Sequence, residues 1–301
     1  MHLAAPLEKN VDDFYALTLV EEKLSLYIND FKDQTVLEDA VTYHFSSGGS
    51  RTRARLTFSF AKNLGLSFED SIVMSCVPEL FHNASLIHDD LQDSDDLRRG
   101  QEAVWKKFGP DIAICIGDFL ISAAYACIAD LSNDIPKSKL IKHVHSKISE
   151  LIKGQLLDIR QCKDQSLNDL DAYENIAAGK SGPLFSLAIT LPLIAKGYSD
   201  SIQLAESVFR HYSIAYQIFD DIGDFKMDQS KQGLKSGVNI ITLYQEKNIL
   251  DPQLKAVNTA LIHLQLAREK LVELPLVCQQ IIHNETLLLE SLIKQTILDQ
   301  N

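Results

Sequence analysis

The chain has 301 residues, of which 46 % are hydrophobic and 23 % are charged, and its formal net charge is −12 at pH 7. These proportions are ordinary for a globular protein with a substantial core. The negative charge argues against nucleic acid as a partner, because binding to a phosphate backbone needs clustered Lys and Arg. It argues equally against unaided binding of any polyanion, so an anionic ligand needs metal ions to mediate.

The cysteines and the first residues indicate the compartment. The five cysteines are scattered and show no metal-binding spacing, which is typical of small core residues in a reducing compartment. The first residues lack a basic start followed by a long apolar core, so no secretory signal is predicted. No uninterrupted apolar stretch reaches membrane-spanning length. We therefore expect a soluble, cytoplasmic protein without a transmembrane segment.

Helix periodicity dominates the chain. Four segments are apolar nearly all round, as expected of central helices in a bundle, namely 71–88, 112–130, 184–195 and 203–219. Apolar residues between 140 and 159 follow the three-and-four spacing of a helix with one apolar face. Strand-like alternation between tight turns is absent, as are linkers and repeats. The sequence predicts one all-α domain spanning 1–301.

The first of these helices runs directly into a group of like charges. Asp89, Asp90 and Asp93 form a DDxxD motif, and positions 89 and 93 share one face of a helix. A like-charged pair at this spacing costs about a few tenths of a kcal/mol, so a single motif of this kind is most simply a solvated helix end. An EF-hand is excluded by the spacing.

The same motif recurs at the end of another apolar helix. The stretch YQIFDDIGDF supplies Asp220, Asp221 and Asp224. Two such motifs, each emerging from a core helix, can face one another across a bundle. Carboxylate oxygens suit Mg²⁺, which keeps some waters and recruits phosphate oxygens. The pair of motifs predicts a magnesium site that grips an anionic diphosphate.

Basic residues accompany the acidic motifs. They are Arg51, Arg53 and Arg55 in GGSRTRARL, Arg98 and Arg99 after the first motif, Lys180 in GKSGPLF, and Lys231 after the second motif. A lone surface Arg is normally a solvated charge. Beside metal-binding carboxylates in an acidic chain, these residues are better explained as diphosphate clamps, since Arg presents a planar fork to phosphate.

This set of motifs, in this order, resembles the trans-type isoprenyl (polyprenyl) diphosphate synthases, which are all-helical prenyltransferases. The resemblance runs from about Ser47 to about Leu243 and is carried by five blocks, which are ELFHNASLIHDDLQDSDDLRRG (79–100), GDFL (117–120), GQLLDI (154–159), GKSGPLF (179–185) and YQIFDDIGD (216–224). It implies a single large helical bundle of the isoprenoid synthase type with the active-site cavity between its central helices, and a homodimer.

The resemblance also implies the reaction. An allylic diphosphate ionises on a magnesium cluster of about three ions, and the double bond of isopentenyl diphosphate attacks the resulting cation. A proton is then lost to the departing pyrophosphate. The charge develops on the leaving group, where metals and basic side chains stabilise it.

Residue by residue, the resemblance implies the following roles. Direct metal ligands are expected at Asp89, Asp93 and Asp220, supported by Asp90, Asp221 and Asp224. The allylic diphosphate is expected at Arg98 and Lys180, with Lys231 a further candidate, and isopentenyl diphosphate at Arg51, His82 and Arg99. Gln217 and Ser181 are expected to face the cation, and the groups acting directly on the reacting atoms are Lys180, Gln217, Asp89 and Asp220. His82 could equally be a core histidine, and His88 is more simply one.

Two departures from the family pattern put the acceptor substrate in question. Ser50 stands where the family has a lysine that contacts isopentenyl diphosphate, and Gly233 and Thr242 replace the usual Asp and Pro after the second motif. Two alternatives stay open. One is a terpene synthase-like enzyme, which the intact second DDxxD disfavours. The other is a noncatalytic subunit of a heteromeric synthase.

Product length is predicted from the helix that carries the first motif. Positions four, five and eight before Asp89 line whatever lies beneath the reacting carbon, and they are Ser85, Ala84 and Phe81. The first two are small and leave room, while Phe81 either forms a floor one turn deeper or simply packs in the core. We expect a product longer than farnesyl, with geranylgeranyl diphosphate first and longer chains next. The preferred allylic starter and the pathway served stay open.

Overall fold

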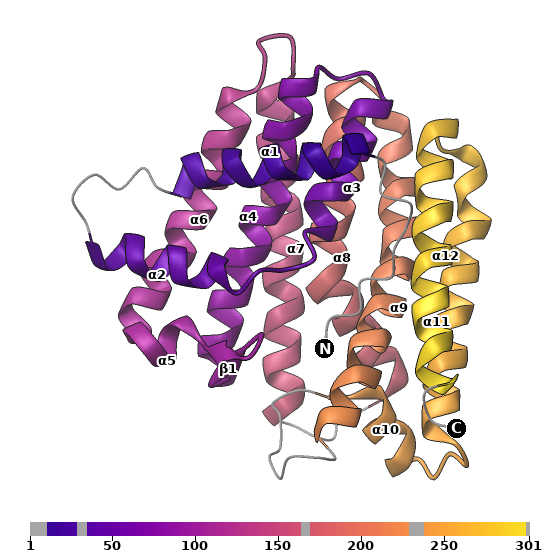
Figure 1. Ribbon diagram of the computed structural model, residues 1–301. Helices are drawn as coiled ribbons and strands as arrows, with labels where there is room; N and C mark the ends of the chain where they lie inside the picture. Colours follow the sequence, from indigo (N-terminus) through magenta and orange to yellow (C-terminus); the bar gives the residue numbers. More distant parts are fainter. Residues whose placement is uncertain (1–10, 29–34, 164–168, 229–237, 299–301) are drawn as a thin grey trace. The chain divides into compact units, whose positions relative to one another are not determined.

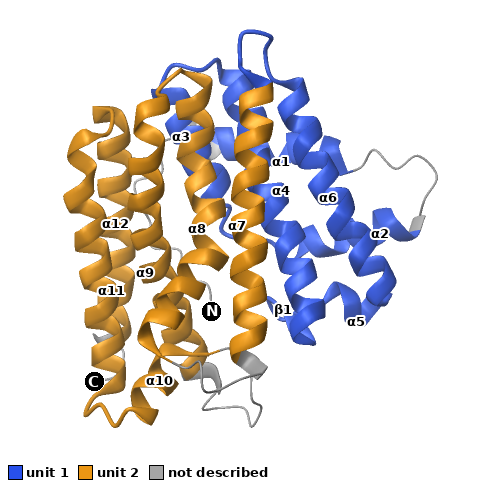
Figure 2. Ribbon diagram, turned by 180° about the vertical axis from the view of Figure 1, so that it is seen from behind, with its two compact units in different colours: residues 1–137 blue, residues 138–301 orange. Residues whose placement is uncertain are grey.

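The computed structural model describes residues 11–28, 35–163, 169–228 and 238–298. The chain divides into two compact units, residues 1–137 and 138–301 (Figures 1 and 2). Helices build both units, so the predicted all-α fold is confirmed. A single domain spanning 1–301 stays a prediction.

The first unit holds six helices and one short hairpin within its described residues. In chain order they are α1 (Val11–Ile28), α2 (Thr35–Ser46), α3 (Thr52–Asn63), α4 (Phe68–Asp93), β1 (Leu97–Arg98), β2 (Gln101–Glu102), α5 (Val104–Phe108) and α6 (Pro110–Asp130). Helix α4 packs chiefly against α6 and α3 and also contacts α1. It is therefore the central helix of this unit, as predicted for segment 71–88.

The bounds of α4 follow from its sequence. The Ser67 side chain accepts a hydrogen bond from the Asp70 backbone N–H at 3.0 Å, which satisfies one of the free donors at the helix start. The first turn is acidic, which suits the positive end of the helix dipole. The helix ends at Ser94, which adopts a left-handed conformation with φ 57°. The first aspartate motif thus occupies the last turns of a buried helix.

A two-residue hairpin follows α4 directly. Leu97 pairs with Glu102, and Arg98 pairs with Gln101 in antiparallel register. The two turn residues, Arg99 and Gly100, both have positive φ, of 52° and 83°, as tight hairpin turns of this kind require. These strands were not predicted, because two residues are too few to show an alternating pattern.

The second unit is also helical. Its described elements are α7 (Lys137–Lys163), which starts at the unit boundary, α8 (Leu170–Ala195), η2 (Ser199–Ser201), α9 (Ile202–Asp228), α10 (Ile240–Glu246), α11 (Pro252–Glu269), η3 (Lys270–Glu273) and α12 (Leu276–Leu298). Helix α9 packs against both α8 and α11, and α11 packs against α12. The apolar segments 184–195 and 203–219 lie within α8 and α9, as predicted.

Two glycines allow α7 and α8 to approach closely. A Cβ atom at Gly154 would lie 2.4 Å from the backbone carbonyl carbon of Gly179, and one at Gly179 would lie 2.9 Å from the Gly154 Cα. Such separations are far inside van der Waals contact, so a side chain at either position would push the helices apart. The glycines of the GQLLDI and GKSGPLF blocks therefore have a packing role.

The prediction of no membrane-spanning stretch counted uninterrupted apolar residues, and it stays a prediction. Helices α6 and α8 are both long and apolar enough by length and composition. Counting uninterrupted apolar residues missed them because Asp118 and Lys180 interrupt the two stretches. The core helix of a bundle passes the same test, and 83 % of the relevant α8 window is buried inside the structure, against 44 % of the α6 window.

Candidate active site

The first aspartate cluster divides into an inner residue and two outer ones. Asp90 is 1 % exposed and accepts a hydrogen bond from Arg98 Nε at 2.8 Å and a second from Arg98 Nη2. Burial raises the pKa of Asp90, although Arg98 opposes the rise. Asp89 and Asp93 are partly exposed. We call Asp90 the inner aspartate of this cluster and Asp89 and Asp93 its outer aspartates.

The hairpin after α4 positions both arginines of the RRG sequence. Arg98 turns back onto Asp90, whereas Arg99 donates to the Gly48 carbonyl and lies 3.5 Å from Ser47 Oγ. A Cβ atom at Gly49 would lie 3.0 Å from two guanidinium nitrogens of Arg99. The second glycine of the GGSR sequence therefore leaves room for this arginine.

Three arginines share one region of the first unit. Burial lowers the pKa of Arg99, and the positive charges of Arg51 and Arg98 lower it further. The pKa of His44 falls to about 4, chiefly through burial, with the same three arginines contributing. Its Nε2 atom lies 2.9 Å from Asn83 Oδ1. This concentration of positive charge is suited to binding an anion.

His82 and His88 lie on different sides of the same helix. Burial, followed by nearby positive charges of which Arg53 is the largest, holds the pKa of His82 well below its ordinary value. His82 is therefore neutral and can offer a hydrogen bond but no ion pair. His88 packs against α6, where a Cβ atom at Gly117 would lie 2.0 Å from its Nε2. The glycine of the GDFL block thus makes room for His88, whose side chain is 26 % exposed.

The second aspartate cluster has the same division. Asp221 is 7 % exposed and accepts hydrogen bonds from Tyr173 Oη at 2.8 Å, Gln217 Nε2 at 3.1 Å and the Ile240 backbone N–H at 2.9 Å. Burial raises its pKa to about 6, against the effect of these bonds. Asp221 is the inner aspartate and anchors the start of α10. Asp220 is exposed and Asp224 is partly exposed, and these two are the outer aspartates.

Lys180 and Gln217 both lie in the second unit, and each has its own partners. Lys180 Nζ lies 2.5 Å from Asp158 Oδ2, across the close approach of α7 and α8. Ser181 Oγ donates to Gln217 Oε1 at 3.4 Å, a long hydrogen bond, while the amide nitrogen of Gln217 is held by Asp221. The predicted residues Ser181 and Gln217 therefore come together, and Lys180 precedes Ser181 on α8. Lys231 and Gly233 lie outside the described residues.

The three residues predicted to set product length lie in the first unit. Phe81 is buried, and its ring meets that of Tyr125 on α6 edge to face, with centroids 5.5 Å apart. Ala84 is buried, and Ser85 is partly exposed and donates to the His82 carbonyl of its own helix at 2.8 Å. Packing of Phe81 in the core is thus observed, and its role as a floor stays a prediction.

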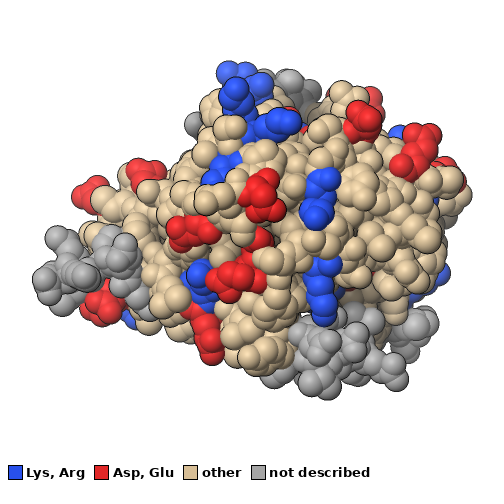
Figure 3. Space-filling model, turned by 90° about the horizontal axis from the view of Figure 1, so that it is seen from above, with Lys and Arg blue, Asp and Glu red and all other residues tan. Residues whose placement is uncertain are grey.

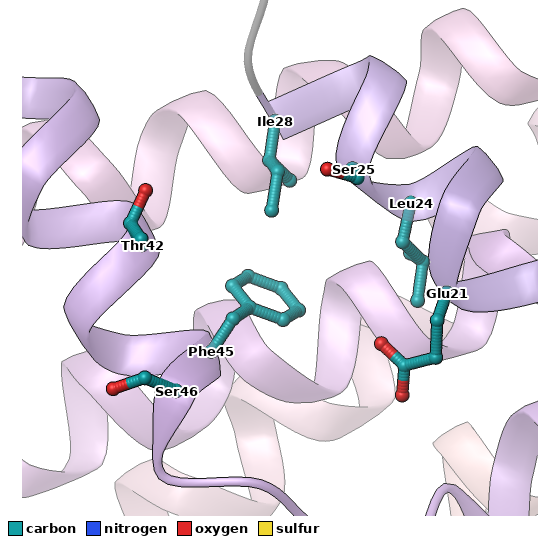
Figure 4. A pocket seen from close by; sticks show the side chains of 7 residues that line it. All are labelled: Glu21, Leu24, Ser25, Ile28, Thr42, Phe45 and Ser46. Carbon is teal, nitrogen blue, oxygen red and sulfur yellow. The ribbon is translucent and has the colours of Figure 1, made fainter. Parts of the chain in front are cut away.

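A cavity of about 280 Å³ lies between α1 and α2 in the first unit. Its wall is mainly apolar, with Leu24 and Ile28 from α1 and Phe45 from α2, and Glu21 at one side (Figure 4). Glu21 and Phe45 also contact Arg51. The cavity therefore borders one of the predicted substrate-binding residues.

The outer aspartates have the chemistry that magnesium requires. Among the described residues, no group of three or more His, Cys, Asp or Glu is arranged to hold a metal ion by itself. Magnesium is commonly held by one or two carboxylates and completes its shell with water and phosphate oxygens. The outer aspartates of each cluster therefore fit magnesium bound together with a diphosphate.

Acidic and basic side chains both occur on the face of the molecule in Figure 3. Several Lys and Arg side chains lie together near the top edge of this view, and others are interspersed with acidic and uncharged ones. The absence of a nucleic-acid partner stays a prediction from the net charge.

Several residues around the site were missed by the sequence analysis. They are Glu21, Glu79, Asp158, Tyr173 and Asn239. Asp158 carried a usable signal, because it belongs to the GQLLDI block. Tyr173 and Glu21 carried none, since each meets its partner over a long separation in the chain and neither lies in a recognisable motif.

The fold and the two clusters define an all-α trans-prenyltransferase. Residues 34–241 match the model of the polyprenyl synthetase family, which is well over half of the chain. The chain belongs to this family, and the resemblance inferred from the motifs is confirmed. It is accordingly a polyprenyl diphosphate synthase by family.

Individual relatives agree on the family but differ in product. A farnesyl diphosphate synthase of Geobacillus stearothermophilus is 32 % identical over 84 % of this chain and 84 % of its own. A geranylgeranyl pyrophosphate synthase of Geoglobus acetivorans is 29 % identical over 74 % of this chain and 70 % of its own. The crystal structure of geranylgeranyl pyrophosphate synthetase from Pyrococcus horikoshii is 25 % identical, with a TM-score of 0.78 over 93 % of this chain and 97 % of that one.

Proposed function

We propose that this chain joins isopentenyl diphosphate to an allylic diphosphate and so makes a longer trans-prenyl diphosphate for isoprenoid biosynthesis. One observation carries the proposal. Both DDxxD motifs have one buried aspartate that accepts hydrogen bonds from the protein and two aspartates that are more exposed. Each motif therefore offers two more exposed carboxylates, which are the oxygen ligands that magnesium prefers. The cytoplasm is the proposed compartment.

The outer aspartates are the proposed magnesium ligands. Magnesium, when bound there, neutralises the diphosphate and stabilises the charge that develops as pyrophosphate departs. Lys180 adds a positive charge to the same leaving group, and its contact with Asp158 keeps the ammonium group in one orientation. Gln217 Oε1 and Ser181 Oγ supply oxygen dipoles for the allylic cation, and Asp221 supports them by fixing the Gln217 amide.

Isopentenyl diphosphate is proposed to bind at Arg51, His82 and Arg99. The two arginines supply charge, and the neutral His82 supplies a hydrogen bond. The double bond of isopentenyl diphosphate forms the new carbon–carbon bond as the carbon–oxygen bond of the allylic diphosphate breaks. The proton lost from the adduct passes to pyrophosphate, so no Ser, Cys or His nucleophile is needed.

Geranylgeranyl diphosphate or a longer chain is the proposed product. Ala84 and Ser85 leave space, and the Phe81–Tyr125 ring pair is the proposed floor. Ala84→Phe should shorten the product and Phe81→Ala should lengthen it, as determined by mass spectrometry of the products. If both variants retain the parent's product, the chain does not grow along this helix face.

A homodimer is proposed as the working form. Helix α6 is apolar, yet only 44 % of its most apolar 18-residue stretch is buried within the chain. We propose that a second copy of the chain packs against the rest of this stretch. Light scattering at micromolar concentration should give twice the 33.7 kDa chain mass. A monomer mass at that concentration would contradict the proposal.

The function is tested with the purified chain and defined substrates. Geranyl or farnesyl diphosphate is incubated with Mg²⁺, with and without isopentenyl diphosphate, and products are identified by mass. We expect elongated diphosphates only when isopentenyl diphosphate is present. Hydrocarbon or alcohol products without it would indicate the terpene synthase-like alternative. Inactivity of the single chain would indicate a noncatalytic subunit.

A further inference from the structure

Arg51 is held in a fixed place by the fold of the first unit. It is the N-cap residue of α3 and adopts a left-handed conformation with φ 49°. Its side chain is 8 % exposed, and its guanidinium lies over the Phe45 ring at 5.4 Å. A buried arginine in this position needs anionic partners.

Two carboxylates from different helices supply that charge. Glu79 of α4 is 2 % exposed, and its Oε1 accepts from Arg51 Nη1 at 3.2 Å and from Asn83 Nδ2 at 3.3 Å. Glu21 of α1 accepts from Arg51 Nε at 2.5 Å and from Nη2 at 3.4 Å. A single guanidinium therefore contacts two carboxylates.

The carboxylates of Glu79 and Glu21 differ in how easily their contacts with Arg51 can be broken. Glu79 belongs to the buried network around α4, so its contact is part of the core. The Glu21 side chain is 47 % exposed, and water can replace its bond to Arg51. Glu21 also occupies the Nε and Nη2 edge, which is the edge that forms paired hydrogen bonds with an incoming carboxylate or phosphate.

Ser50, the residue before Arg51, adds no positive charge to this region. Ser50 is exposed, and its hydroxyl accepts from Thr52 Oγ1 at 2.9 Å. It brings no positive charge, although the family resemblance places a lysine here. Glu21 itself precedes residues 34–241, which match the family model. The surroundings of Arg51 thus lack the positive charge that the family pattern provides at position 50, and they include the Glu21 carboxylate.

We propose that Glu21 is a positioning residue that occupies Arg51 in place of the substrate and weakens binding of isopentenyl diphosphate until the diphosphate displaces it. The inference rests on the proposed function, in which Arg51 binds that substrate. Glu21 sets the affinity of the acceptor site and takes no part in bond making. Its removal should therefore act on the KM for isopentenyl diphosphate and leave kcat almost unchanged.

The test is a binding measurement that does not depend on turnover. Isothermal titration calorimetry with isopentenyl diphosphate, and separately with inorganic pyrophosphate, compares the parent chain with Glu21→Gln. Glu22→Gln is the matched control, because Glu22 is also exposed and is the next residue of α1. We expect Glu21→Gln to tighten binding of both ligands about 10-fold, as loss of one charged competitor predicts, and Glu22→Gln to change nothing.

Steady-state kinetics then separates competition from a structural role. Glu21→Gln should lower the KM for isopentenyl diphosphate about 10-fold and leave the KM for the allylic substrate unchanged. Ser50→Lys should lower the same KM about 10-fold by restoring a positive charge. If Glu21→Gln does not fold, Glu21→Ala removes the same carboxylate, and an unchanged affinity for both ligands in that chain overturns the proposal.

Failure of this inference can be told apart from failure of the proposed function. Weaker or unchanged binding in a folded Glu21→Gln chain would overturn the inference, because Glu21 would then support Arg51 instead of competing for it. Elongation by the parent chain would still stand. If Glu21→Gln binds pyrophosphate more tightly but the parent chain does not elongate its substrate, the role of Glu21 as a competitor is supported. The proposed reaction would then be wrong.

Discussion

The two aspartate clusters share one spacing, yet their inner aspartates are held by different chemistry. Asp90 in the first cluster pairs with a charged residue, Arg98, eight positions along the same chain. Asp221 in the second cluster is held by a tyrosine, an amide side chain and a backbone N–H. The comparison teaches that a DDxxD motif specifies the helix face of its aspartates but leaves open which partners hold the inner one.

The largest expected effect concerns the outer aspartates, which should behave alike in both clusters. Asp89→Asn and Asp220→Asn should each lower kcat about 100-fold or more, because each removes charge that supports several kcal/mol of metal stabilisation. Steady-state assays across a range of Mg²⁺ concentrations provide the measurement. Asp96→Asn, which removes an exposed carboxylate paired with Lys106, is the control and should retain activity. Undiminished turnover in excess chelator would contradict metal dependence.

The inner aspartates should differ in their contribution to stability. Asp221→Ala leaves three donors unpaired in a buried place, and we expect it to lower the free energy of unfolding by about 2–3 kcal/mol. Asp90→Ala should cost less, because Arg98 still lies near Asp89 and Asp95, whose charges also raise its pKa. Urea unfolding of both variants measures the difference. Equal losses would show that the partners of the two inner aspartates are equivalent.

Acid should affect the surroundings of the first cluster through His44. Burial lowers the pKa of His44 to about 4 in the folded state, against about 6.5 unfolded. Between these values the unfolded chain binds a proton that the folded chain does not, so stability falls as the pH falls from 6.5 to 4. The slope from one such group is at most about 1.4 kcal/mol per pH unit.

His44→Gln should remove this contribution. The free energy of unfolding, measured by urea titration at pH 5 and pH 7, should then change less between the two values than in the parent. His283→Gln on the exposed side of α12 is the matched control and should keep the parent's dependence. An unchanged slope in His44→Gln would mean that His44 does not stay neutral in the folded chain.

Local patterns in the sequence were enough to predict the helices and the motifs. Apolar periodicity located α4 and α9, and the DDxxD spacing placed three carboxylates at the end of each apolar run. These features depend on residues a few positions apart. The sequence also predicted that Lys180 and Gln217 belong to one site, through the family resemblance.

Long-range contacts could not be predicted from one sequence. Arg51 and Glu21 are 30 positions apart, and Tyr173 and Asp221 are 48 apart, so no periodicity connects them. The close approach of Gly154 and Gly179 depends on how two helices cross. Such pairs follow from packing of whole helices, and the predicted roles of metal ligand and supporting residue therefore rested on the resemblance alone.

We propose that the outer aspartates bind the metal, whereas the inner aspartates stabilise the fold through their hydrogen bonds to the protein. Electron paramagnetic resonance of Mn²⁺, added with inorganic pyrophosphate, measures metal binding directly in the parent, Asp220→Asn and Asp221→Asn chains. We expect Asp220→Asn to lose bound Mn²⁺, whereas Asp221→Asn should retain it at the parent's affinity. Loss of Mn²⁺ from Asp221→Asn, with retention in Asp220→Asn, would contradict the account.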